Sequence, residues 1–584
     1  MKKKINKKVF YLLLSLLLVI ILGFVFFNNT VSKSNNSENT LFYVVQARLA
    51  NSNFDYKKAN AFYKKAYKAD PFNANLLEEY LLFSIMQRDL KQSFSLSQKV
   101  ILKNPQHVLA NLVILVEDIK ANGIDSAVNN LTATSFEKDS LIDIVLTTLK
   151  SHQAIRENNL ETFETLNADI QAIVPDLYLY QRGLLHLLNK KEDVAKQDFF
   201  NLNNQFVNIE SIIYYSQLLY ASGKKEDATK YFYDHLSDNF LTQQKALDYV
   251  STPIEIDEKS VISDLIFRIS KMLSYDIDGV YLYSDSIAVA NIALMLDSNN
   301  IPALVEVASF YKAIGNYDKA LSIYTNLPKS SYYHRIFAQD IIEMYKEQGH
   351  IKPAITYIKN QMKDDPNNAR LLIELGLIHN QSGDYEEAIA SYSEALRISQ
   401  ENNFRLGQWL AYFFRGISYD KSGDWEKAEQ DILAAKNINS TDPVLINYLA
   451  YSWINRGEKI EESLAMLKQA MKDMPNNPNI LDSYAWGLFK SKKYTEALEY
   501  SEKANAIVSY DPTLINHLGD ILWQLGYKKD AIIAWQRALN LSPNKELTLE
   551  LSKKLEGEFP PYLDKNIKEK TGYVSFIDRN RSTK

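Results

Sequence analysis

The sequence predicts an all-α fold, a solenoid built from repeated helix–turn–helix units. Turn-forming residues are scarce, since the 584 residues include 18 Gly and 15 Pro, about half of the roughly 12% found in average proteins. β-Sandwiches and propellers need frequent turns, so this scarcity argues against them. The second observation is a repeat, because the segments that start at Ala369, Trp409 and Pro512 share one pattern of small and large residues.

Each of the three segments places small residues at fixed positions. Gly stands at positions 8 and 15, Ala at 20 and 27, and a large residue at 24: Gly376, Gly383, Ala388, Ala395 and Tyr392; Gly416, Gly423, Ala428, Ala435 and Ile432; Gly519, Gly526, Ala531, Ala538 and Trp535. Small residues at positions 8 and 20 let two helices approach closely, and Gly at position 15 turns the chain between them. Each unit buries its faces only against its neighbours, so the array forms a solenoid.

This pattern resembles the tetratricopeptide repeat (TPR), a helix–turn–helix unit of about 34 residues. The resemblance implies a right-handed superhelix in which the first helix of each repeat lies on the concave side. The same spacing continues upstream, where Ala59, Tyr63 and Ala66 mark a first repeat. It is degenerate over 74–175 and weakest over 241–300.

The repeats divide the chain into parts with different expected structures. They are an N-terminal membrane anchor or signal segment (1–27), a polar linker (28–40), TPR-like helical repeats that are partly degenerate (41–240), an irregular helical region (241–300), a C-terminal TPR array (301–544), a capping helix (545–560) and a polar tail (561–584).

The N-terminus has the composition of a membrane segment. An uncharged run extends from Val9 to Phe27 and would reach about 28 Å as a helix, enough to cross the hydrocarbon core. Five lysines precede it, and a lysine cluster of this kind stays in the cytoplasm. We therefore expect a single-pass protein of the bacterial inner membrane with the repeats in the periplasm. Cleavage as a signal peptide, which would release the repeats into the periplasm, is the alternative.

The stretch from Val444 to Leu541 resembles a group of bacterial cell-envelope TPR proteins. The matching pieces are INYLAYSWINRGEKIEESLAMLKQAM, ILDSYAWGLFKSKKYTEALEYSEKA and INHLGDILWQLGYKKDAIIAWQRAL. Such proteins are similar in length and carry an N-terminal signal or anchor. The resemblance implies a scaffold rather than a reaction.

The sequence contains no constellation that predicts catalysis. It lacks the P-loop, dinucleotide-binding, G-x-S-x-G and H-E-x-x-H motifs. The absence of Cys excludes disulfides and thiolate metal sites, and the eight His show no pair at metal-ligand spacing. We expect no enzyme activity, cofactor or metal. A net charge of −5 also makes nucleic acid an unlikely partner.

A candidate partner-binding groove lies on the first helices of the last three complete repeats. It combines amides and carboxylates with large aromatic residues: Asn447, Tyr451, Asp482, Trp486, Phe489, Lys490, Asn516, Asp520 and Trp523. Amides can bond the backbone of an extended peptide while aromatic pockets take its side chains. The alternative is that these aromatic residues pack against the neighbouring first helix or the C-terminal cap.

These observations predict a non-enzymatic scaffold or adaptor that holds proteins together in the bacterial cell envelope, in assembly, secretion or maintenance. The expected partners are a protein or peptide in the concave groove and the membrane through residues 9–27. Two alternatives are a periplasmic co-chaperone for unfolded or outer-membrane polypeptides and a glycan-binding subunit of a polysaccharide export or cell-wall complex.

Overall fold

A computed structural model describes residues 37–132, 136, 141–157, 159–173, 175–202, 209–236, 240–253, 256–273, 283–328, 331–542, 544–559 and 570. Every regular element in these residues is an α-helix, which confirms the all-α prediction. The predicted membrane segment 1–27 and most of the predicted linker and tail lie outside these residues. Among the described helices, none is both long and apolar enough to cross a bilayer.

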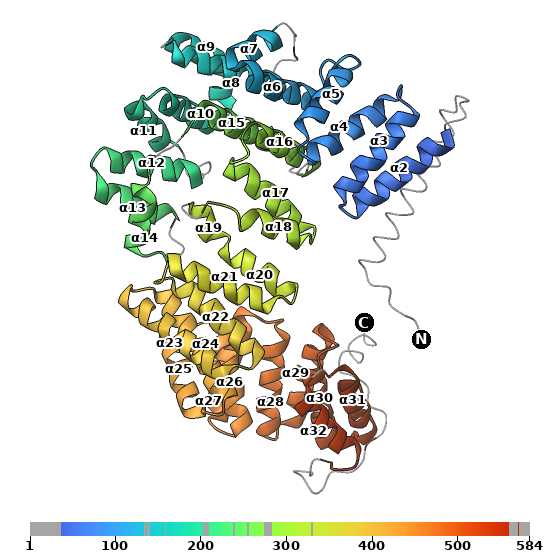
Figure 1. Ribbon diagram of the computed structural model, residues 1–584. Helices are drawn as coiled ribbons and strands as arrows, with labels where there is room; N and C mark the ends of the chain where they lie inside the picture. The colour runs from blue at the N-terminus through green and yellow to red at the C-terminus, as the bar shows by residue number, and fades with distance from the viewer. Residues whose placement is uncertain are drawn as a thin grey trace. The chain divides into compact units, whose positions relative to one another are not determined.

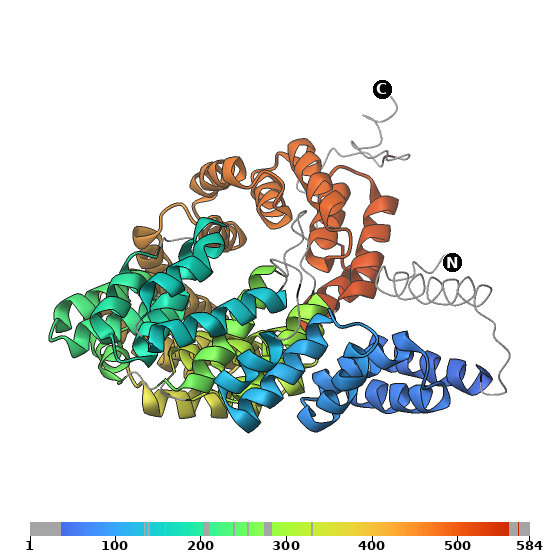
Figure 2. The same cartoon turned by 90° about the horizontal axis from the view of Figure 1, so that it is seen from above.

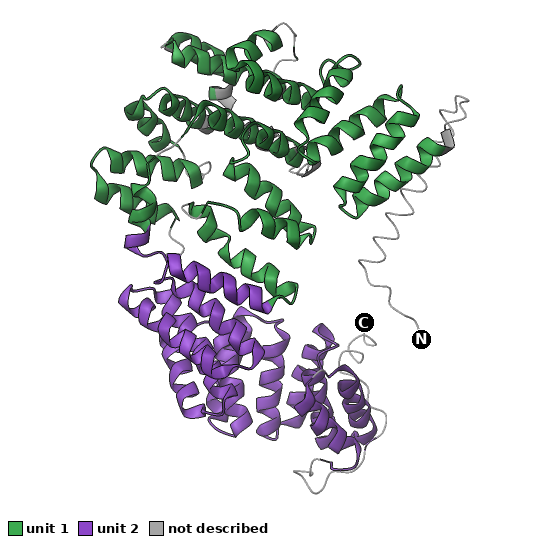
Figure 3. Ribbon diagram, viewed as in Figure 1, with its two compact units in different colours: residues 1–236, 246–350 green, residues 237–245, 351–584 purple. Residues whose placement is uncertain are grey.

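The chain forms two compact units (Figure 3). Unit 1 comprises Met1–Leu236 and Ala246–His350, and unit 2 comprises Ser237–Lys245 and Ile351–Lys584.

Unit 1 begins with consecutive helical hairpins (Figure 1). Their helices are α2 (Ser37–Ser52), α3 (Tyr56–Ala69), α4 (Ala74–Met86), α5 (Leu90–Ile101), α6 (Val108–Asn122), α7 (Ile124–Thr132), α8 (Leu141–Arg156), α9 (Leu160–Ile173), α10 (Pro175–Leu188), α11 (Glu192–Phe200), α12 (Ile209–Ala221) and α13 (Lys225–Leu236). Within each hairpin the two helices pack against each other, and successive hairpins pack in chain order.

The region predicted to be irregular, 241–300, contains three helices: α14 (Gln243–Ser251), α15 (Glu258–Leu273) and α16 (Tyr283–Leu296). The chain then returns to hairpins with α17 (Ile301–Ala313), α18 (Tyr317–Tyr324), α19 (Tyr332–Ile336) and α20 (Ala338–Glu347).

Unit 2 contains the most regular repeats. Its helices are α21 (Ile351–Asp364), α22 (Ala369–Ser382), α23 (Tyr385–Glu401), α24 (Arg405–Lys421), α25 (Trp425–Ile438), α26 (Pro443–Arg456), α27 (Ile460–Asp473), α28 (Pro478–Lys490), α29 (Tyr494–Ile507), α30 (Pro512–Gln524), α31 (Lys528–Leu541) and α32 (Lys545–Leu555). The predicted capping helix is α32, which packs on α31.

The repeat pattern follows from close contact between the two helices of each hairpin. A Cβ atom at Gly376 would lie 2.5 Å from the Tyr392 ring, and one at Gly519 would lie 2.5 Å from Trp535. Positions 8 and 24 of the repeat therefore form a small–large pair. Gly383, at position 15, has a φ of +83°, a left-handed conformation that suits glycine.

Proline and a polar cap start three first helices of unit 2. Pro443, Pro478 and Pro512 stand at the first helical position, where the missing N–H costs nothing. The side chain of the preceding residue, Asp442 in α26 and Asp511 in α30, accepts hydrogen bonds from free backbone N–H groups.

Candidate functional site

We give the name A row to a run of successive first helices in each unit. In unit 1 the A row is α4, α6, α8 and α10, and in unit 2 it is α22, α24, α26, α28 and α30. The nine residues of the predicted groove lie on α26, α28 and α30. The structure buries six of them, Asp482, Trp486, Phe489, Asn516, Asp520 and Trp523.

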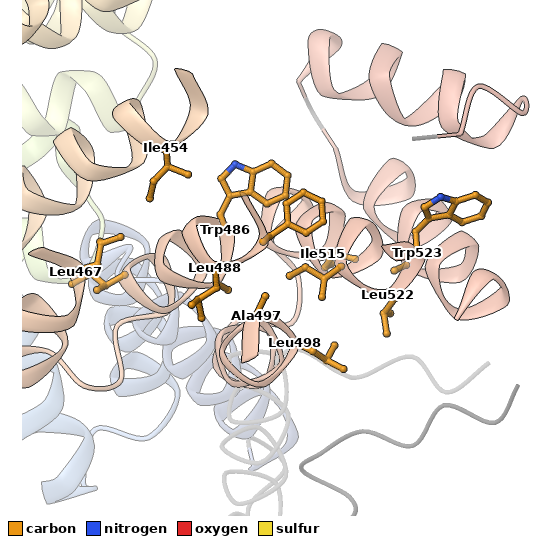
Figure 4. Close-up of a cluster of buried hydrophobic side chains, with 14 of the residues drawn as sticks. Ile454, Leu467, Trp486, Leu488, Ala497, Leu498, Ile515, Leu522 and Trp523 are labelled. Atoms are coloured by element: carbon orange, nitrogen blue, oxygen red, sulfur yellow. The ribbon is translucent and has the colours of Figure 1, made fainter. Parts of the chain in front are cut away.

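Trp486 of α28 contacts both neighbouring first helices, α26 and α30, and it belongs to the same buried cluster as Ile454 and Ile515 (Figure 4). Its Nε1 donates a hydrogen bond of 2.8 Å to Asn455 Oδ1 on α26. Its ring stacks on Phe489 at 4.6 Å between centroids and on His517 of α30 at 4.2 Å. Only 9% of Trp486 is exposed. These contacts are those of a side chain that packs neighbouring repeats together.

His517 and Asp482 form a buried ion pair beside this stack. His517 Nδ1 lies 2.7 Å from Asp482 Oδ2. Burial by itself lowers the pKa of His517, but the attraction of Asp482 and Asp520 outweighs it, so the pKa of His517 is raised above its usual value. The charged imidazolium is therefore favoured and ties α30 to α28.

The remaining buried residues hold the C-terminal cap. Lys554 of α32 donates to Asn516 Oδ1 at 2.9 Å and to Asp520 Oδ1 at 2.7 Å. Trp535 Nε1 donates to the same Asp520 oxygen at 2.9 Å. Burial raises the pKa of Asp520, although Lys554 opposes that effect. Trp523 stacks on Phe559 at 4.6 Å, just beyond the cap.

Three of the predicted residues stay accessible. Asn447 and Tyr451 are half-buried, and Lys490 is exposed with its Nζ 4.9 Å from the centroid of the Trp486 ring. Val444 and Asn479, on the same helices, are also exposed. Partner binding by the nine residues stays a prediction, and the accessible positions are the ones a partner can reach.

Sequence reasoning missed Asn455, His517 and Lys554, which supply the polar partners of the buried set. Asn455 lies one helical turn after Tyr451 on the same first helix, α26, so its place beside the predicted groove could have been inferred from the spacing. His517 and Lys554 become informative only once α28, α30 and α32 are side by side.

The A row of unit 1 is covered by the chain itself. Helix α16 packs against α4 and α6, and α15 packs against α8 and α10. Figure 1 shows these two helices running along the four first helices. From Ile287 to Leu296 every residue of α16 is buried, because this stretch is apolar on nearly every face, with Asn291 its one polar side chain.

Polar contacts fix α16 in place. Arg88 Nε of α4's C-terminal turn donates to Asn291 Oδ1 at 2.9 Å. Lys120 Nζ of α6 donates to the Met295 carbonyl at 2.9 Å. Both contacts join residues that are far apart in the sequence. Directional hydrogen bonds, in addition to apolar packing, therefore fix where α16 lies.

A charge network fixes α15. Arg268 pairs with Asp264 at 2.8 Å and with Glu210 of α12 at 2.6 Å, and Tyr180 of α10 donates to Asp264 at 2.8 Å. Burial raises the pKa of Glu210, which Arg268 opposes. Glu210 and Asp264 also line a cavity of about 570 Å³. Their charges are engaged by Arg268, so they hold α15 against α10 and α12.

In the described residues, no cluster of His, Asp and Glu could hold a metal ion.

Three segments match family models of the tetratricopeptide repeat: residues 303–328, 367–435 and 512–545. They correspond to the α17–α18 hairpin, to α22–α25 and to α30–α31.

Two curated relatives are similar in sequence. A TPR repeat-containing protein of Methanocaldococcus jannaschii is 26% identical over 278 residues, 44% of this chain and 45% of that protein. The Photosystem I assembly protein Ycf3 of Rippkaea orientalis is 30% identical over 115 residues, 18% of this chain and 65% of that protein. The match thus spans less than two thirds of either relative. No cell-envelope family is among these similarities.

Solved structures of repeat proteins are also similar. The APC/C hetero-tetramer Cut9–Hcn1 is 15% identical, with 89% of this chain and 96% of that chain covered and a TM-score of 0.37. A tetratricopeptide repeat protein from Parabacteroides merdae is 19% identical, with 44% and 99% covered and a TM-score of 0.36. Together with the glycine-spaced hairpins, the three matched segments show that the chain contains tetratricopeptide repeats.

Proposed function

We propose that this chain is a non-enzymatic scaffold that binds partner proteins along the A row of unit 2, in the envelope of a bacterial cell. TPR proteins are in general scaffolds for protein–protein interaction. The observation that carries the proposal is a difference between the two A rows. In unit 1 the helices α15 and α16 pack over the A row. In unit 2 the first-helix residues Val444, Asn479 and Lys490 are exposed, so a partner can reach them.

The accessible side chains of α26 and α28 suit an extended peptide. Val444 is 58% exposed, Asn479 and Lys490 are exposed, and Asn447 and Tyr451 are half-buried. Asn side chains can both donate to and accept from a peptide backbone, while Val444 and Tyr451 offer apolar contact.

Photocrosslinking from intact cells tests the proposal. A photoreactive residue replaces Asn479 on α28, and the matched control replaces Glu496, which is exposed on the second helix α29 of the same repeat. We expect one or a few discrete adducts from position 479 and none from 496. A broad smear from position 479 would instead support a periplasmic co-chaperone, and equal adducts from both positions would refute binding along the A row.

The envelope location is part of the proposal and has its own test. The uncharged run 9–27 behind five lysines supports a single-pass anchor in the inner membrane with the repeats in the periplasm. We expect the full chain to stay in the membrane after alkaline extraction and a reporter fused after residue 40 to be active outside the cytoplasm. Complete release by alkali would favour a cleaved signal segment.

A further inference from the structure

The first hairpin of unit 1, α2 with α3, exposes an apolar stripe that solenoid ends normally lack. Leu41, Phe42, Val45 and Leu49 are 46%, 56%, 52% and 44% exposed. They follow one another at the spacing of a single helix face. Terminal repeats of a solenoid need a polar outer face for solubility. The apolar face of α2 therefore points to a partner surface.

The second helix of this hairpin is strongly basic. Helix α3 contains no acidic residue, and its exposed stripe carries five lysines: Lys57, Lys58, Lys64, Lys65 and Lys68. None of these lysines forms an ion pair within the described part of the chain. The basic stripe stands out in a protein whose net charge is −5.

Side-chain contacts connect the apolar and basic stripes. Lys65 Nζ lies 5.7 Å from the centroid of the Tyr43 ring, and the Tyr43 ring lies edge-on to Phe42 at 5.6 Å. Tyr43 also stacks on Phe62 of α3 at 6.5 Å. Figure 2 shows α2 and α3 side by side. An exposed apolar helix beside unpaired lysines and aromatic rings is the composition of a helix that lies at a lipid interface.

We propose that the α2–α3 hairpin docks on the surface of an anionic lipid bilayer. Leu41, Phe42, Val45 and Leu49 enter the boundary between headgroups and acyl chains, and the α3 lysines pair with anionic headgroups. The docking rests on the proposed anchor: because the uncharged run ends at Phe27 and the segment 28–36 spans at most about 30 Å, an anchored chain would hold this hairpin close to the membrane. This docking goes beyond the scaffold role, since it fixes how unit 1 meets the membrane.

The chain contains no cysteine, so single-cysteine labels can test the docking in the full-length protein. An environment-sensitive fluorophore is attached at Phe42→Cys, and the matched control is Ser222→Cys in the α12–α13 turn, which is also exposed. Each labelled protein is reconstituted into vesicles of phosphatidylcholine with phosphatidylglycerol or of phosphatidylcholine alone, both with a nitroxide lipid as quencher.

We expect the label at position 42, but not that at position 222, to be strongly quenched in the anionic vesicles. A lysine near an anionic surface is worth about a fivefold change in binding. Replacing Lys57, Lys58, Lys64 and Lys65 by Ser should therefore reduce the docked fraction steeply, and circular dichroism checks that the variant is folded. High salt should act in the same direction.

Several outcomes would overturn the docking. Co-flotation of the protein with vesicles while the label at 42 stays in water would leave the anchor intact and refute hairpin docking. Shielding of position 42 from water without lipid quenching would assign the stripe to a second copy or to the chain's own segment 9–27. Equal quenching in neutral vesicles, unchanged by the lysine substitutions, would refute the anionic-lipid assignment.

Discussion

The two units use the same kind of repeat but cover its first helices differently. In unit 1 the helices α15 and α16 pack along the A row. Their backbone carbonyls and charged side chains make hydrogen bonds and ion pairs with the neighbouring helices. Unit 2 covers α26, α28 and α30 with side chains from neighbouring helices and from the cap α32. The position of a residue in a repeat therefore does not decide whether it can bind a partner. Burial within each unit decides which positions remain accessible.

The largest expected effect comes from charging the centre of α16. Ile292 is fully buried, so Ile292→Asp would place an unpaired carboxyl in an apolar core at a cost of about 4–5 kcal/mol or more. Because all six tryptophans lie in unit 2, their fluorescence reports that unit alone. We expect Ile292→Asp to lower the thermal transition followed by far-UV circular dichroism and to leave the tryptophan transition in place.

The control for this prediction is Ile533→Asp, because Ile533 of α31 is 66% exposed. An exposed substitution of this kind changes stability by no more than about 0.5 kcal/mol. Loss of the tryptophan transition in Ile292→Asp would show that the two units do not unfold separately.

A second prediction compares the charge pairs that hold the covering helices. Arg268→Met leaves both Glu210 and Asp264 without their cationic partner. Lys554→Met removes the cationic partner chiefly of Asp520. Removing one partner of a buried pair costs about 3–5 kcal/mol, so both variants should be destabilised, Arg268→Met the more. Hydrogen exchange should increase in α15 for the first variant and in α32 for the second. Increased exchange in α32 for Arg268→Met would contradict the assignment.

Much of unit 2 could be predicted from its sequence because its repeats are regular. The Gly376–Tyr392 and Gly519–Trp535 pairs are separated by a fixed number of residues in one hairpin, so local spacing is enough to identify them. The covering of unit 1 depends on contacts between distant residues, such as Arg88 with Asn291. The largely apolar sequence of α16 indicates that the helix is buried, but it does not indicate which helices cover it.

The candidate site could be predicted only in part for the same reason. The repeat pattern placed Trp486 on a first helix, but its burial depends on contacts with Asn455 and His517 from two other repeats. Asp520 is covered by Lys554 of the cap. The position of Trp486 and Asp520 in the repeat predicts the helix on which each lies, whereas tertiary packing determines how exposed each side chain is.

The units should respond to pH in opposite directions through two histidines. Burial, with help from Lys191 and Arg182, lowers the pKa of His186 in unit 1 from 6.5 to about 4. The unfolded chain then binds the proton more readily, so this contribution to unit 1 stability is lost as the pH falls from about 6.5 to 4. The pKa of His517 in unit 2 is raised, so its contribution is present below about 6.5 and lost as the pH rises through the raised value.

Urea unfolding of variants across this pH range measures both contributions. His186→Gln should flatten the acid side of the unit 1 stability profile, whereas His517→Gln should reduce the stability of unit 2 most at low pH. His350→Gln serves as the control, since His350 is exposed in the turn before α21. Parallel pH profiles for the two units in the unmodified protein would contradict the predicted opposition.

The smallest expected change in stability belongs to Lys490, and it separates packing from binding. Its ammonium group lies 4.9 Å from the centroid of the Trp486 ring, a contact worth about 0.5–1 kcal/mol at an exposed site. Lys490→Ala should therefore lower the midpoint of the tryptophan transition only slightly. If unit 2 binds its partner along the A row, the same substitution should weaken crosslinking from Asn479 by far more than this loss of stability explains. If the crosslinking yield falls only in proportion to the stability of unit 2, Lys490 merely shields the Trp486 ring. Val444 and Tyr451 on α26 would then be the remaining candidates for the binding surface.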